Sequence, residues 1–153
     1  MSAGATVEAM HAEQAMEFPY KHSTGETIGR FLAGLKEQKT IWGQRVPGQG
    51  VVVPPIGYSE IDASPAGEWV VVKDTGTVTA VAVVHKPLPR LHPFEEPFAY
   101  ILVKLDGADT SLAHVVKGDL SKLKVGARVQ AEWAPDDQRK GHLRDIATFR
   151  VVG

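Results

Sequence analysis

Segments rich in β-branched residues, separated by turn signals, fill the second half of the chain and constrain its fold more than any other feature. The first predicts one long bent strand, Trp69–Lys73 plus Thr77–Val84, because Asp74-Thr75-Gly76 between them favours a kink. Further strands are expected at Ala99–Leu105, Ser111–Val116, Ala127–Trp133 and Leu143–Val152. A short helix at Gly118–Leu123 would give the element order of an OB barrel. We therefore predict a mainly β fold built on a five-stranded OB barrel.

An amphipathic helix is expected before the barrel, from about Thr24 to Glu37. Ser23 followed by Glu26 forms a capping-box pattern at its start. Gly29 and Gly34 each cost about 1 kcal/mol relative to alanine, so packing of an apolar stripe must hold the helix together. That stripe consists of Ile28, Phe31, Leu32 and Leu35.

The chain divides into four segments on composition. Residues 1–17 are rich in Ala, Glu and Met without an apolar face, so we expect a mobile N-terminal arm. Residues 18–40 carry the helix. Residues 41–66 are rich in Gly, Pro and Val and are expected to form a small hairpin around Val51–Val53. Residues 67–153 are expected to form the barrel.

Overall composition excludes several classes of protein. A chain of 153 residues can bury a sizeable core, and with no cysteine it has neither disulfides nor thiolate nucleophiles. We expect a cytoplasmic protein, because no secretory signal and no membrane-spanning run of about 18 apolar residues is present. The net charge of −1, with scattered Lys and Arg, argues against a nucleic-acid partner.

No motif indicates a catalytic site. Gly57–Ile61 begins like a nucleophile elbow but has Ile61 where glycine is required, so Ser59 is expected to be structural. Adjacent Glu95 and Glu96 are more often a solvated rim than an acid/base pair. The histidines lack the spacing of metal ligands: His11, His22, His85, His92, His114 and His142. We therefore expect this chain to contribute no catalytic residue and no metal site.

A series of short motifs resembles the zinc-ribbon and OB-fold proteins that accompany thiolases. In chain order the motifs are Phe18-Pro19-Tyr20, Ser23-Thr24-Gly25, Arg30-Phe31-Leu32, Gly34-Leu35, Pro54-Pro55, Asp74–Val78, Pro97–Tyr100 and Lys104–Gly107. The resemblance extends from Phe18 to Val152. In that family four cysteines flanking the proline pair hold zinc. The matching positions here are Arg45, Gly48, Ser59 and Asp62, and none of them can supply a thiolate.

The resemblance therefore implies a degenerate, metal-free ribbon. A structural zinc site can contribute about 10 to 16 kcal/mol to ordering a small module, and this chain must fold without it. We expect Val51–Val53, the Pro54-Pro55 pair and Trp42, packed on the barrel or on a partner, to take over that role. The alternative is that the segment is only a loop.

The resemblance also implies a function. Such proteins are non-catalytic subunits of acyl-CoA enzymes, either acyltransferases or the aldolases that shorten steroid side chains. The larger, thiolase-like subunit carries the chemistry, while the small one stabilises it and shapes the substrate channel. On this basis we expect a hetero-oligomer that handles a coenzyme A thioester and needs no cofactor of its own. Two alternatives stay open: a nucleic-acid-binding OB module, and a stand-alone acyl-CoA-binding or enzymatic barrel.

Two surfaces are predicted to contact the partner. In the loop Lys86–Pro97, four prolines stiffen the chain while Leu88, Leu91 and Phe94 are apolar. Its Arg90 and His92 are expected to meet the phosphates of coenzyme A or acidic groups of the partner. The alternative is that Leu91 and Phe94 only cap the barrel. The second surface is the helix stripe of Ile28, Phe31, Leu32 and Leu35. Trp42, Pro54 and Pro55 of the ribbon segment are also predicted contact residues.

Overall fold

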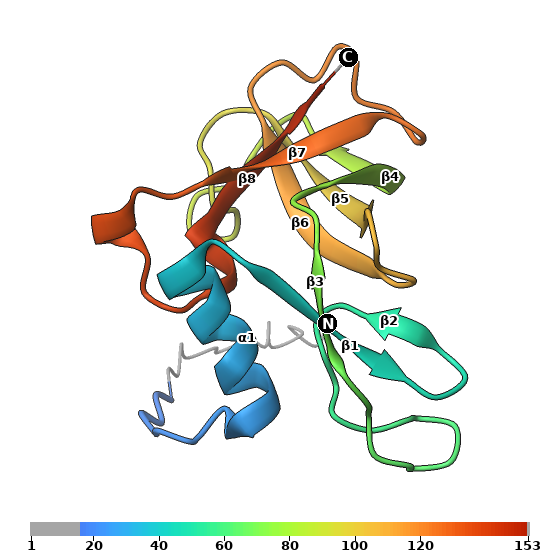
Figure 1. The fold of residues 1–153 in the computed structure, drawn as a ribbon. Helices are drawn as coiled ribbons and strands as arrows, with labels where there is room; N and C mark the ends of the chain where they lie inside the picture. The colour runs from blue at the N-terminus through green and yellow to red at the C-terminus, as the bar shows by residue number, and fades with distance from the viewer. Residues whose placement is uncertain (1–15, 153) are drawn as a thin grey trace, which may run out of the picture.

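The computed structural model describes residues 16–152, so nearly all of the predicted N-terminal arm lies outside the described residues. One helix is followed by two groups of strands (Figure 1). The elements are α1 (Gly25–Gln38), β1 (Ile41–Val46), β2 (Gly50–Val52), β3 (Trp69–Val72), β4 (Thr75–Val84), β5 (Phe98–Leu105), β6 (Ser111–Lys117), β7 (Arg128–Trp133), β8 (Ile146–Val151) and the short 3-10 helices η1 (Asp136–Gln138) and η2 (Leu143–Asp145). Within the described part, no helix has the length and apolarity needed to span a bilayer.

Strands β4 to β8 form a closed barrel in the order β4-β5-β6-β8-β7, which confirms the predicted five-stranded OB fold. β4 pairs antiparallel with β5 along most of its length and with β7 only over Thr75–Thr77. β6 and β8 meet in parallel where Val116 faces Phe149. The barrel interior is filled by alternate apolar residues of each strand, and Val103, Val129 and Phe149 are fully buried.

The predicted long bent strand is wrong, because its two halves belong to different sheets. β3 pairs antiparallel with β1, with Trp42 opposite Val71, and only β4 enters the barrel. The chain turns between them at Lys73, whose N–H donates to the carbonyl of Asp106. Propensity in this segment specifies extended backbone but not the neighbouring strand.

The helix predicted at Gly118–Leu123 is also wrong, because this segment consists of bends and turns. Gly118 has a positive φ of 91°, and the Asp119 carboxylate accepts a hydrogen bond from the N–H of Ser121, which favours a turn over a helix. Leu120 and Leu123 still pack against the barrel core. The last strand begins at Ile146, later than predicted, because η2 precedes it.

The ribbon segment contains an ordered hairpin, so the alternative of a simple loop is wrong for β1 and β2. With β3 they form a three-stranded sheet in the order β2-β1-β3. The N–H of Val51 donates to the Asp109 carboxylate at 2.8 Å, and the N–H of Val53 donates to the Thr110 hydroxyl at 2.8 Å. These bonds join the hairpin to the β5–β6 turn of the barrel.

Helix α1 forms where the apolar periodicity predicted it, but the predicted capping box is absent. Thr24 is the N-cap residue without a side-chain cap, and the Ser23 hydroxyl accepts from the N–H of Gly25. Phe31 and Leu35 are buried in the core cluster, and the helix lies against β1. This packing offsets the low helix propensity of the two glycines.

Candidate functional site

The outward face of the sheet β4-β5-β6 is apolar where an antiparallel sheet with one solvated face is normally polar. Register places the outward residues in cross-strand rows, since directly opposite residues share a face. Tyr100 and Leu102 on β5 each retain 41% of their surface exposed. We call the two adjacent rows the apolar face: Ala80, Leu102 and Ala113 in one, and Ala82, Tyr100 and Val115 in the other.

The next outward row, at one end of the apolar face, is covered by the loop between β4 and β5. Phe98 lies in that row and is fully buried, although it points away from the barrel interior. The rings of Phe94 and His92 contact it edge-on, with centroids 5.2 and 5.7 Å away. Lys117 lies over the Phe94 ring at 5.4 Å. The loop therefore docks on the sheet through Phe94 and His92.

The same loop is closed on itself by a histidine. The Nδ1 atom of His92 accepts a hydrogen bond from the N–H of Leu88 at 2.8 Å, while the N–H of His92 donates to the Leu88 carbonyl. Leu88 and Leu91 remain 51% and 69% exposed. Of the two apolar residues proposed to cap the barrel, Phe94 packs on its outer face and Leu91 stays exposed.

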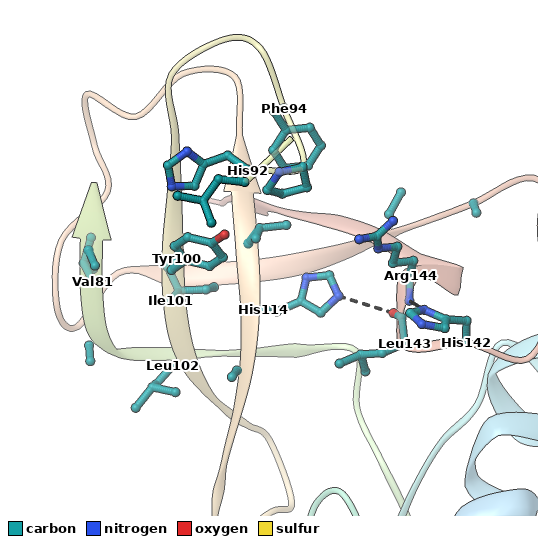
Figure 2. Close-up of a pocket in the computed structure, with 18 of the residues that line it drawn as sticks. Val81, His92, Phe94, Tyr100, Ile101, Leu102, His114, His142, Leu143 and Arg144 are labelled. Atoms are coloured by element: carbon teal, nitrogen blue, oxygen red, sulfur yellow. Dashed lines mark hydrogen bonds between the residues drawn. The ribbon is translucent and has the colours of Figure 1, made fainter. Parts of the chain in front are cut away.

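A cavity of about 940 Å³ opens between the β4–β5 loop, the apolar face and the segment between β7 and β8 (Figure 2). Its volume is that of a site for a small organic ligand. The residues lining it include two arginines and three histidines but no aspartate or glutamate. These polar residues are Arg90, His92, Tyr100, His114, Gln138, His142 and Arg144. The cavity therefore combines apolar walls with a rim that favours anionic groups.

His114 lies inside this cavity on β6, and its ring points toward η2 (Figure 2). Its Nε2 atom is 3.4 Å from the carbonyl oxygen of Leu143, and its ring contacts Phe149 edge-on. Nδ1 is buried without a partner among the described residues. Burial lowers the pKa of His114, and main-chain hydrogen bonds oppose that shift only in part. Burial in this partly apolar site therefore favours the neutral form of the His114 imidazole.

The far rim of the cavity is held by a buried carboxylate. Asp145 accepts hydrogen bonds from the N–H groups of Lys140, Gly141 and His142, at 2.9, 2.8 and 3.2 Å. Burial opposes ionisation of Asp145, but these three donors outweigh it and lower its pKa. His142 Nδ1 in turn accepts from the N–H of Arg144. Two rim residues, His142 and Arg144, are therefore carried on a locally fixed backbone.

The structure brings together only part of the predicted contact residues. Arg90, His92 and Phe94 line the cavity. Phe31 and Leu35 are core residues, which corrects the expectation that they belong to an exposed surface, because α1 packs its stripe inward. A partner role for the half-buried Ile28 and Leu32 stays a prediction.

The remaining predicted contacts lie at the ribbon, away from the cavity. Trp42 is half-buried, packs edge-on against Trp69 and lies under the Arg30 guanidinium, so it packs on this chain's own helix and sheet. Pro54 is exposed and Pro55 buried, and neither lines the cavity.

Three of the four positions predicted to match zinc ligands form an ion pair or hydrogen bonds with other residues of the chain. Arg45 pairs with Glu68 at 2.9 Å. Ser59 is buried, and its hydroxyl accepts from the N–H of Ile61. Asp62 accepts from both the hydroxyl and the N–H of Ser64, and these bonds lower its pKa.

The fourth position, Gly48, has a positive φ of 74° and sits next to Ile61, so the two loops of the ribbon still meet. Among the described residues, no group of three or more His, Cys, Asp or Glu could hold a metal ion.

Comparison with known proteins supports the fold and the predicted resemblance. Residues 69–134 match the family described as "ChsH2, C-terminal OB-fold domain". The chain is similar to a solved structure titled "Ltp2-ChsH2(DUF35) aldolase", with 24% identity and a TM-score of 0.59, over 78% of this chain and 92% of that one. It is also similar to a DUF35-family protein of unknown function from Sulfolobus solfataricus, with 24% identity and a TM-score of 0.56, over 71% and 78% of the two chains. No curated protein matches the chain. These matches confirm the predicted OB fold.

Proposed function

We propose that this protein is a non-catalytic accessory subunit of a thiolase-like acyl-CoA enzyme in the cytoplasm. The observation that carries the proposal is the apolar face, because the large apolar side chains of Tyr100 and Leu102 occupy outward, solvent-facing positions on a barrel strand. Contiguous apolar patches on a solvent-facing surface commonly mark interaction sites. Similarity to a chain from an aldolase complex supports a subunit role.

The cavity beside that face suits the substrate of such an assembly. A coenzyme A thioester joins a phosphate-bearing nucleotide to an apolar acyl chain. Arg90 and Arg144 on the rim have the charge to meet phosphates, and the apolar walls suit the acyl chain. We propose that the partner supplies the catalytic groups and that this chain closes one side of its acyl-CoA channel. The reaction of such an assembly is either carbon–carbon bond cleavage of a steroid side chain or acyl transfer.

The test is co-purification with a co-expressed thiolase-like protein of the same host. We expect a stable complex whose acyl-CoA turnover depends on this chain. Leu102→Asp should weaken the complex at least tenfold, about 1.4 kcal/mol, because it places a charge in the buried contact. Val71→Asp is the matched control, since Val71 is 58% exposed on β3 and outside the apolar face. Separate elution of the two proteins, with unchanged turnover, would refute the proposal.

A nucleic-acid-binding role is the second candidate, because OB folds bind oligonucleotides between the two loops that flank this cavity. Tyr100 offers a stacking surface, and Arg90 and Arg144 offer positive charge. The net charge of −1 weighs against this role. A salt-dependent affinity for single-stranded DNA that Tyr100→Ala removes would favour it over the accessory role.

A further inference from the structure

The second half of β4 has an open edge. β7 pairs with β4 only over Thr75–Thr77, and the segment at Gly126 and Ala127 takes the hydrogen bonds of Val78. From Ala80 to Val84 the strand pairs with β5 on one side, and no described residue forms main-chain hydrogen bonds with its other side. Unpaired N–H and C=O groups on a strand edge are a template for another strand.

This edge lacks the features by which proteins usually protect an open strand. Residues Ala80–Val84 contain no charge and no proline. Ala82 is exposed, and Val83 keeps 40% of its surface exposed. β-Branched residues dominate the segment and favour extended pairing.

We propose that this edge pairs antiparallel with the same edge of a second copy of the chain. Directly opposite residues of an antiparallel pair point to the same face of the sheet. When a two-fold axis normal to the sheet relates the two strands, the central residue of the contact must therefore lie opposite the same residue of the second copy. The centre of the free segment is Ala82. Val81 then faces Val83 of the second copy, and Ala80 faces Val84. Every pair is apolar, so self-pairing brings no like charges together.

The pairing also explains the position of the apolar face. Ala80 and Ala82 belong to both the free edge and the apolar face. Pairing at Ala82 would join two three-stranded sheets into one six-stranded surface, β6-β5-β4 continued by β4-β5-β6 of the second copy. The two apolar faces would then lie side by side on that surface. This inference goes beyond the accessory role and does not depend on it.

Sedimentation equilibrium of the full chain alone, over a wide concentration range, measures the association directly. We expect a dimer, and Val83→Lys should raise its dissociation constant by about tenfold or more, because the charge enters the two-fold contact twice. Leu91→Lys is the matched control, since Leu91 is 69% exposed on the β4–β5 loop and outside the edge.

Crosslinking tests the register. Ala82→Cys introduces the only thiol of the chain, and a short thiol-reactive crosslinker should join two copies through it. Leu91→Cys should give little product. A monomer at all concentrations without crosslinking at residue 82 would overturn the proposal. If Val83→Lys instead disrupts only binding to a co-expressed thiolase-like protein, the edge belongs to that partner and the second-copy assignment is wrong.

Discussion

The guanidinium of Arg139 donates its Nε–H to the main-chain carbonyl oxygen of Lys36, 2.8 Å away, in the last turn of α1. The Arg139 side chain is only 5% exposed and also donates to the Ala134 carbonyl and the Asp136 carboxylate. A cation at a helix C-terminus satisfies carbonyl groups that the helix itself leaves free. This arginine therefore fastens the helix to the segment that forms the far rim of the cavity.

Replacing Arg139 should loosen both elements. We expect Arg139→Ala to lower the free energy of unfolding by about 1 to 3 kcal/mol, because it leaves two carbonyl groups in part-buried hydrogen bonds without their donor. Arg139→Lys should recover only part of this loss, since an ammonium cannot reproduce the planar donor set. Urea denaturation measures the change. Arg144→Ala, at an exposed position, should stay within about 0.5 kcal/mol, and an equal loss in both variants would contradict the assignment.

An ion pair between β7 and the β5–β6 turn predicts how stability depends on acid pH. Arg128 donates to the Asp106 carboxylate at 2.8 Å and Thr75 donates to it at 2.6 Å, and these bonds hold the pKa of Asp106 well below its usual range. The unfolded chain therefore takes up a proton first as the pH falls below about 4, and the stabilisation present at neutral pH is lost there.

Asp106→Asn should remove that contribution. The variant should lose less stability than the natural chain between about pH 5 and pH 2, while being less stable at pH 7. Thermal unfolding followed at each pH measures this difference. Asp137→Asn, at an exposed position in η1, is the control. Identical pH profiles for natural chain and Asp106→Asn would show that the pair contributes nothing.

Much of the fold could be predicted because its signals are local. The three-and-four spacing of Ile28, Phe31, Leu32 and Leu35 predicted α1, and β-branched runs between turns predicted the barrel strands. Pairing partners are not local signals. Trp69–Val72 has the composition of a strand, but only the assembled structure shows that β1, and not the barrel, offers it an edge.

The candidate site was predicted in part, through Arg90, His92 and Phe94, because prolines marked their loop as rigid. The apolar face was missed. Ala99–Leu105 reads as an almost continuous apolar run, so outward Tyr100 and Leu102 could not be told from inward residues without the register. His142 and Arg144 were missed as rim residues because chain folding alone brings η2 to the cavity.

The buried imidazole of His114 predicts a second pH effect, at higher pH. Because its pKa is lowered in the folded protein, the unfolded chain binds more protons as the pH falls below about 7, and folding stability decreases there. His114→Phe should flatten this decrease between about pH 7 and pH 5, and the new ring should pack against Phe149. His85→Phe, at an exposed position, should leave the profile unchanged. Chemical denaturation at several pH values measures it, and a slope that survives His114→Phe would assign the effect elsewhere.

The residues at the predicted zinc-ligand positions of the ribbon segment predict that the thermal stability of the protein does not depend on metal. Zinc ribbons lose stability when a chelator removes the ion, because metal binding and folding are coupled. Here the matching positions carry Arg45, Gly48, Ser59 and Asp62, which bond to neighbouring residues or meet the opposite loop directly. We expect the melting temperature to be the same in EDTA and in excess zinc, within error. By contrast, Ser59→Ala should cost about 1 kcal/mol, since it removes a buried acceptor for the N–H of Ile61. A melting temperature that falls on chelation would show that a metal still holds this segment.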